Sequence, residues 1–205
     1  MTKYSKIQFK KSFSEKEIKI LREILDIIRD IFKKSTNIEP KLFLIGMKAL
    51  YYYFGIETFS PAPVSLDIDV NFDILLDWTN YRRLIPQKIK EALASRDYNV
   101  SVELGLITIQ KGDILIHLTT VIDFSEEIIG DHIPELNLDV ANKSFLIYTK
   151  LSRFDLYRDV DRLENLFKNR EIDIEEILKF TPELEQEIIK ERINSLLKKK
   201  NGNFV

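Results

Sequence analysis

Residues 65–70 read Ser-Leu-Asp-Ile-Asp-Val and alternate polar with apolar side chains. Successive side chains of a β-strand point to opposite faces, so this pattern predicts a strand that buries its aliphatic residues in a core. The same alternation places Asp67 and Asp69 together on the other face. Two carboxylates on one strand face are oxygen ligands suited to a divalent cation.

A glycine-centred turn is expected upstream of this strand. Residues 42–45 form an apolar run that is typical of a buried strand, and Gly46 permits a sharp turn into a helix over residues 47–54. Earlier in the chain, a capping box opens residues 14–34, whose apolar spacing predicts an amphipathic helix.

The remaining segments complete a sheet flanked by helices. We expect a helix over residues 78–96, interrupted where Pro86 opens a second helix. The β-forming stretches and a hairpin turn at Lys111-Gly112-Asp113 predict strands over residues 100–103, 106–110 and 114–119. His117 then lies inside a strand.

Beyond Pro134 the pattern is helical. The predicted helices cover residues 144–153, 156–168 and 172–180, with a last helix capped by Thr181-Pro182. The expected fold class is α/β (α+β), a mixed sheet flanked by helices. Residues 1–135 are expected to form the N-terminal helix and the core, and residues 136–205 a C-terminal helical region packed on that core.

Composition limits the possible chemistry. The 205 residues include no cysteine, which excludes disulfides and thiolate metal sites and leaves Asp, Glu and His as metal ligands. A net charge of -2 gives no overall attraction for nucleic acid. No apolar run is long enough to span a bilayer, and the N-terminus lacks the apolar stretch of a signal peptide, so we expect a cytoplasmic protein without membrane contact.

The order of strand, glycine turn, helix and Asp-x-Asp strand resembles the core of the DNA polymerase β nucleotidyltransferase superfamily. Two later motifs resemble the helical features of its AbiEii-type branch, which includes toxin components of toxin-antitoxin systems. They are Lys150-Leu151-Ser152-Arg153 and Arg158-Asp159-Val160-Asp161-Arg162-Leu163. Together the matching features span roughly residues 42–166, and their order is more specific than any one motif.

The resemblance implies an enzyme that moves a nucleoside monophosphate from an NTP to an RNA or protein acceptor, with an antitoxin protein as a possible partner. Asp67 and Asp69 would bind Mg²⁺ or Mn²⁺. Other residues would contact the substrates. The phosphate contacts would be Gly46, Met47, Lys48 and Ser65, and the later basic residues facing the triphosphate or the acceptor would be Lys150, Arg153 and Arg158.

The chain departs from the superfamily pattern at two functional positions. Met47 follows Gly46 where a second small residue is usual. His117 stands where the third carboxylate is expected, and an imidazole can serve as a base or a ligand. Asp113 and Asp123 are possible substitutes, although Asp113 suits a turn.

Simpler interpretations and other functions stay open. Asp67 and Asp69 can belong to a solvated edge strand, His117 can be a structural residue, and the later basic side chains can be an exposed helix face. The fold can also serve as a nucleotide-binding or interaction module without turnover. A metal-dependent glycosyltransferase also uses Asp-x-Asp, but the short chain and the Gly46 turn argue against that class.

Overall fold

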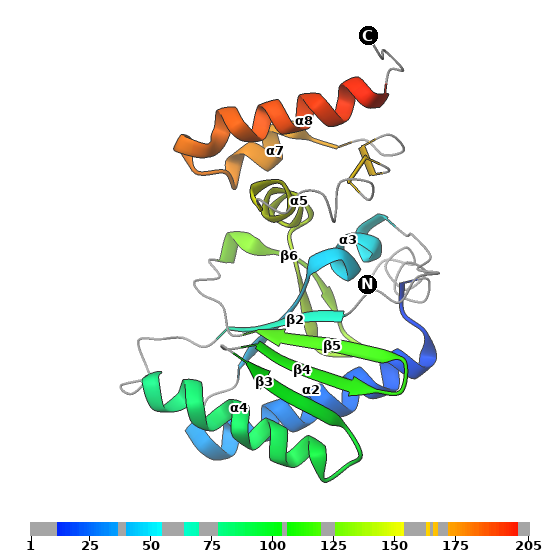
Figure 1. Ribbon diagram of the computed structural model, residues 1–205, viewed down its shortest axis with the longest axis vertical. Coiled ribbons are helices and arrows are strands. Elements are labelled where there is room, and N and C mark those ends of the chain that lie inside the picture. Colours follow the sequence, from blue (N-terminus) through cyan, green and yellow to red (C-terminus); the bar gives the residue numbers. More distant parts are fainter. Residues whose placement is uncertain are drawn as a thin grey trace. The chain divides into compact units, whose positions relative to one another are not determined.

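A computed structural model gives the architecture (Figure 1). It describes residues 12–36, 40–54, 64–69, 78–103, 106–119, 126–153, 163–164, 166–167 and 172–200. The chain divides into two compact units, Met1–Ala141 and Asn142–Val205. Two strands that the sequence analysis missed, over residues 129–133 and 138–141, belong to the sheet of the first unit.

The first unit contains a seven-stranded mixed sheet with the order β3-β4-β5-β2-β1-β7-β6. β2 is parallel to β5 and β1 is parallel to β7, whereas the other neighbours are antiparallel. The strands are β1 (Lys41–Ile45), β2 (Val64–Asp69), β3 (Asn99–Glu103), β4 (Leu106–Lys111), β5 (Ile114–Thr119), β6 (Ile129–Ile133) and β7 (Leu138–Ala141). The predicted mixed sheet flanked by helices is confirmed.

The described part of the first unit contains the helices α2 (Glu15–Thr36), α3 (Gly46–Phe54) and α4 (Trp78–Ala94), together with the short 3-10 helix η2 (Glu126–Ile128). The predicted capping box opens α2: the Glu17 amide donates to Ser14 Oγ at 3.1 Å, and the Ser14 amide donates to Glu17 Oε2 at 2.7 Å. α2 and α4 lie side by side along the sheet (Figure 1).

Strand alternation gives the sheet one apolar face and one polar face. The apolar face is buried and includes Leu42, Leu44, Val100, Ile107, Ile109, Ile116, Leu118, Leu138 and Val140. The inward stripe of α2, formed by Leu21, Ile24, Leu25 and Ile28, is also buried. The opposite face is the polar face, where strand pairing aligns positions 65, 67 and 69 of β2 with polar residues of the other strands. These residues are partly exposed and are Thr108, His117, Thr119 and Asp139. Phe43 is the buried aromatic residue of this polar face.

The expected break at Pro86 is wrong, because α4 runs through this residue. A proline inside a helix removes one backbone hydrogen bond and crowds the preceding turn. Here Ile85, Ile89 and Leu93 are buried along α4, so tertiary packing keeps the helix continuous across the proline.

The second unit contains α5 (Lys143–Ser152), α7 (Ile174–Lys179), the 3-10 helix η3 (Glu183–Glu185) and α8 (Gln186–Lys200). The predicted helix over residues 156–168 falls largely outside the described residues. Thr181 does not cap the last helix as expected, because its hydroxyl donates back to the Ile177 carbonyl at 3.0 Å and η3 precedes α8. Across the described residues, no helix combines the length and apolarity needed to cross a membrane.

Candidate active site

Strand register brings the predicted site positions onto one face of the sheet. In β2, Asp67 is paired with Phe43 of β1 on one side and with Thr119 of β5 on the other. Ser65, two residues earlier, is paired with Ile45 and His117. Paired residues of neighbouring strands share a face, so positions 65, 67 and 69 lie on the polar face with His117 and Thr119.

The predicted glycine turn lies at one end of this face. Gly46 directly follows Ile45, has a φ of 72° and begins α3, a conformation that L side chains rarely adopt. The first amides of a helix lack intrahelical acceptors and favour an anion. Ser65 and His117 are paired with each other and lie next to this turn, because Ser65 is also paired with Ile45. Asp67 lies two residues further along β2, which is about 7 Å. A ligand that contacts both levels must therefore be extended, as a chain of linked phosphates is.

Lys48 has a carboxylate partner within the first unit. Its side chain is 2% exposed, and its Nζ lies 2.7 Å from Glu17 Oε1 and 5.0 Å from the centroid of the Phe13 ring. Met47 is also buried. The ammonium group thus links the start of α3 to the first turn of α2, and contact of Lys48 or Met47 with a phosphate stays a prediction.

The later basic residues belong to the second unit. Lys150 lies in the last turn of α5, and Arg153 is the C-cap of the same helix. Asn142 caps the other end of α5, where its side chain accepts a hydrogen bond from the Ser144 amide at 2.8 Å. Arg158 and Asp123 lie outside the described residues. Asp113 occupies the predicted hairpin turn, where a hydrogen bond from the Lys16 ammonium lowers the pKa of its carboxyl group.

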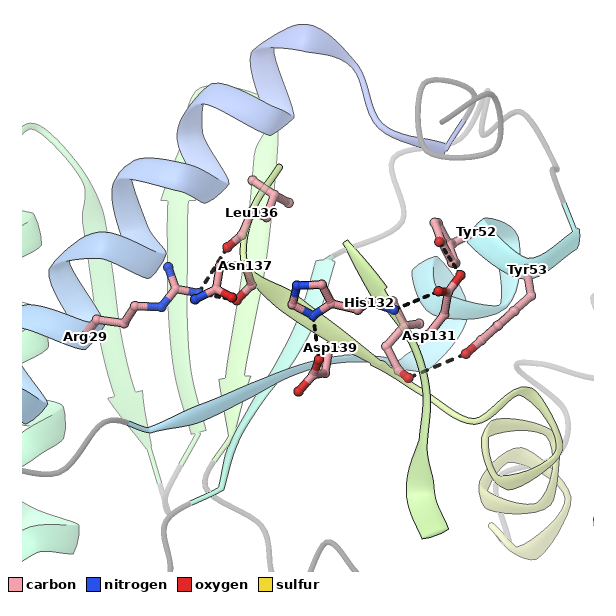
Figure 2. Close-up of polar contacts among 9 residues, drawn as sticks. Arg29, Tyr52, Tyr53, Asp131, His132, Leu136, Asn137 and Asp139 are labelled. Atoms are coloured by element: carbon pink, nitrogen blue, oxygen red, sulfur yellow. Dashed lines mark hydrogen bonds and ion pairs between the residues drawn. The ribbon is translucent and has the colours of Figure 1, made fainter. Parts of the chain in front are cut away.

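The sequence analysis missed a polar pair on β6 and β7 (Figure 2). His132 Nδ1 lies 2.7 Å from Asp139 Oδ1, and the two residues are directly paired in the sheet. Asp139 is also paired with Phe43, which places the histidine and the aspartate on the same face as Asp67. The alternation of Leu138 and Val140 with polar residues could have predicted β7 from the sequence. The signal is weak because β6 and β7 are short.

Tyrosines of α3 and an arginine of α2 fix the position of this hairpin (Figure 2). The Tyr52 hydroxyl donates to Asp131 Oδ2 at 2.5 Å, and the Tyr53 hydroxyl donates to the Val140 carbonyl at 3.5 Å. Arg29 Nη2 donates to the Leu136 carbonyl at 3.0 Å and to the Asn137 carbonyl. The strands that carry His132 and Asp139 are therefore anchored to two helices.

Alkaline pH should test the Tyr52 anchor. Burial, and then the hydrogen bond to Asp131, raise the pKa of Tyr52 above its usual value of 10.0. A raised pKa in the folded state means that the contribution of Tyr52 to stability is complete below pH 10 and declines as the pH rises above it. We expect Tyr52→Phe to make the loss of unfolding free energy between pH 9 and about pH 11 less steep in urea denaturation. An unchanged slope would contradict this assignment.

The donor set of the β2 strand fits a magnesium ion. Mg²⁺ is usually held by one or two protein carboxylates, with phosphate oxygens and water completing six ligands. Asp67 and Asp69 occupy alternate positions of one strand, which is a suitable pair for such a site. Among the side chains that the structure describes, no group of three or more His, Cys, Asp or Glu can hold a metal.

Comparisons with known proteins give remote structural similarity only. No protein-family model matches the sequence, and no curated protein matches it. The solution structure of the antibiotic-resistance factor ANT(2'')-Ia is similar with 13% identity and a TM-score of 0.43, over 90% of this chain and 95% of that chain. A crystal structure of ANT(2")-Ia in complex with adenylyl-2"-tobramycin has 12% identity and a TM-score of 0.39, over 87% of this chain and 97% of the other.

JHP933 from Helicobacter pylori is similar with 14% identity and a TM-score of 0.42, over 93% of this chain and 95% of that chain. At these TM-scores the similarities assign neither a function nor a branch to this chain. The resemblance to AbiEii-type enzymes stays a prediction.

Proposed function

We propose that this protein is a metal-dependent nucleotidyltransferase that transfers a nucleoside monophosphate from an NTP to a hydroxyl group of RNA or protein. The observation that supports the proposal is the polar sheet face on which Asp67, Ser65 and His117 occupy neighbouring positions beside the Gly46 turn. The opposite face of the same strands is apolar and buried, and its packing holds these strands in position.

In this proposal, different residues of the site would bind the metal and the phosphates. Asp67 and Asp69 would hold Mg²⁺ or Mn²⁺, which when bound neutralises charge on the phosphate oxygens. The first amides of α3, after Gly46, would bind the phosphates at the other level of the face, and the Ser65 hydroxyl would donate a hydrogen bond there. His117 would contact the phosphate chain or its cation from β5.

In the proposed reaction, the oxygen of the acceptor hydroxyl forms a bond to the α-phosphorus of the NTP. The bond between this phosphorus and the oxygen that bridges to the β-phosphate breaks, and pyrophosphate leaves with the electron pair. Lys150, Arg153 and Arg158 are proposed as further cationic contacts to the triphosphate or the acceptor. The resemblance to toxin components suggests an antitoxin protein as a partner.

Transfer of label tests the proposal. The purified protein is incubated with each NTP labelled at the α-phosphate, with Mg²⁺ or Mn²⁺ and a cell extract. We expect acid-precipitable label that requires the metal and disappears with a chelator. Separate digestion with ribonuclease and with protease then identifies the acceptor class. Absence of metal-dependent label with all four nucleotides would contradict the proposed function.

One observation favours a second candidate, a nucleotide-binding module without turnover. The positions of β5 that lie on the polar face are Leu115, His117 and Thr119, so β5 offers no carboxylate to this face. The second candidate predicts that calorimetry detects binding of an NTP with Mg²⁺ while the labelling assay detects no transfer. Robust transfer would eliminate it.

A further inference from the structure

A lysine lies directly opposite the second aspartate of the Asp-x-Asp strand. In the antiparallel pairing of β1 with β2, Lys41 is the partner of Asp69. Paired residues of neighbouring strands share a face, so Lys41 lies on the polar face together with Asp67 and Asp69. The Cβ atoms of such a pair are about 5 Å apart. The sheet therefore places a cationic residue beside the carboxylates that are proposed to hold the metal.

Lys41 is exposed, in contrast to the buried Lys48. It is the first residue of β1, and the three residues that follow it are buried. Among the ion pairs between described side chains, none involves Lys41, whereas Lys48 is paired with Glu17. The ammonium group of a lysine ends a flexible four-carbon chain. It can therefore reach a ligand whose cation is bound at Asp69.

The polar face has a group that attracts anions at each end. At one end, the first amides of α3 follow Gly46, beside Ser65. At the other end, Lys41 is level with Asp69, which is four residues from Ser65 along β2, or about 13 Å. Asp67 lies between these two levels. An NTP whose terminal phosphates bind at the turn and whose cation binds at the aspartates therefore directs its α-phosphate toward Lys41.

We propose that Lys41 binds the α-phosphate of the NTP and makes binding of the cation depend on the nucleotide, an inference that rests on the proposed function. Without nucleotide, the ammonium group offsets part of the charge of the two carboxylates and weakens their attraction for a divalent cation. When the NTP binds, its phosphates supply negative charge, and the ammonium group donates a hydrogen bond to a nonbridging oxygen of the α-phosphate. Its positive charge then lies beside the phosphorus that the acceptor oxygen attacks.

The variant Lys41→Met should change two affinities in opposite directions. It removes the charge and keeps an unbranched side chain. Titration with Mn²⁺ alone, followed by electron paramagnetic resonance, should show binding about fivefold tighter than in the wild type, because a repelling charge is gone. Calorimetry uses Mg²⁺ with each NTP analogue in which a methylene group joins the α- and β-phosphates and prevents transfer. The affinity for the preferred analogue should fall about tenfold. A purely structural role of Lys41 does not predict opposite changes.

Three controls assign the effect to the charge of Lys41 and to the α-phosphate. Lys41→Arg keeps the charge and should keep both affinities close to the wild-type values. Lys16→Met makes the same change at an exposed lysine that pairs with Asp113 in the hairpin between β4 and β5, and it should alter neither affinity. Pyrophosphate with Mg²⁺ lacks an α-phosphate, so Lys41→Met should bind it as the wild type does. Thermal unfolding checks that each variant is folded.

Two results would overturn this proposal alone. One is an unchanged affinity of Lys41→Met for the nucleotide analogue. The other is binding of Mn²⁺ alone that is unchanged or weaker in this variant, or an equal loss of affinity for pyrophosphate. In these cases, label transfer by the wild type that is lost in Asp67→Asn keeps the proposed function. If the wild type neither transfers label nor binds Mn²⁺ through Asp67 and Asp69, the proposed function fails as well.

Discussion

Asp67→Asn and, separately, Asp69→Asn should each lower metal-dependent nucleotide transfer at least about 1000-fold, the largest effect that we expect from any single substitution. Asparagine keeps the shape of aspartate but removes the negative charge that binds the cation. A cation that stabilises developing charge contributes several kcal/mol to the barrier, and each 1.36 kcal/mol is about tenfold in rate. The initial rate of label incorporation at saturating NTP and Mg²⁺ measures the effect.

A matched substitution provides the control. Asp113→Asn makes the same chemical change in the hairpin between β4 and β5, where the carboxylate is 78% exposed and paired with Lys16. We expect this variant to transfer nucleotide at close to the wild-type rate. Normal labelling by both Asp67→Asn and Asp69→Asn would show that the metal assignment is wrong, and an equal loss in Asp113→Asn would point to a general effect of charge.

Patterns of neighbouring residues in the sequence predicted β2, the turn at Gly46 and the start of α2. The alternation in residues 65–70 reports strand geometry directly, and β2 covers Val64–Asp69. The turn at Gly46 could be predicted because a positive φ is open to glycine and the flanking residues switch from a strand pattern to a helix pattern. The capping box of α2 is also local, since its two hydrogen bonds join residues three positions apart.

Non-local pairing could not be predicted in the same way. β6 and β7 contain five and four residues, too few for a clear period, and the register of β6 shifts between Ile129 and Asp131. His132 and Asp139 acquire meaning only when β7 joins the sheet beside β1. The alignment of His117 with Ser65 likewise depends on the parallel pairing of β5 with β2.

Lys48 illustrates the same limit for a single side chain. Its position two residues after Gly46 suggests a phosphate contact. The structure buries it against a carboxylate 31 positions earlier in the chain. A helix that packs on one side cannot expose every polar residue of its first turn, and sequence spacing alone does not say which residue faces the core. The contribution of the Lys48–Glu17 ion pair to the free energy of unfolding can be measured by substitution.

Glu17→Gln should destabilise the protein by about 3 kcal/mol, because it leaves the Lys48 ammonium buried without its carboxylate. Glutamine can keep the capping hydrogen bond to the Ser14 amide, so the loss reports the ion pair rather than the helix cap. Adding Lys48→Met should recover about 2 kcal/mol, since the buried charge is then removed together with its partner. Urea denaturation of the two single variants and the double variant measures the coupling.

The exposed pair of Asp30 and Lys34 supplies the control, because its atoms are 2.6 Å apart but its side chains are 56% and 73% exposed. Screening by water keeps such a pair below about 0.5 kcal/mol, so Asp30→Asn should change stability little. If Glu17→Gln costs no more than Asp30→Asn, the ammonium of Lys48 does not depend on Glu17. The effect of Lys48→Met on NTP binding, measured by calorimetry, would then test the predicted phosphate contact directly. A large coupling makes Lys48 a structural residue, and phosphate binding at this turn then falls to the amides of α3.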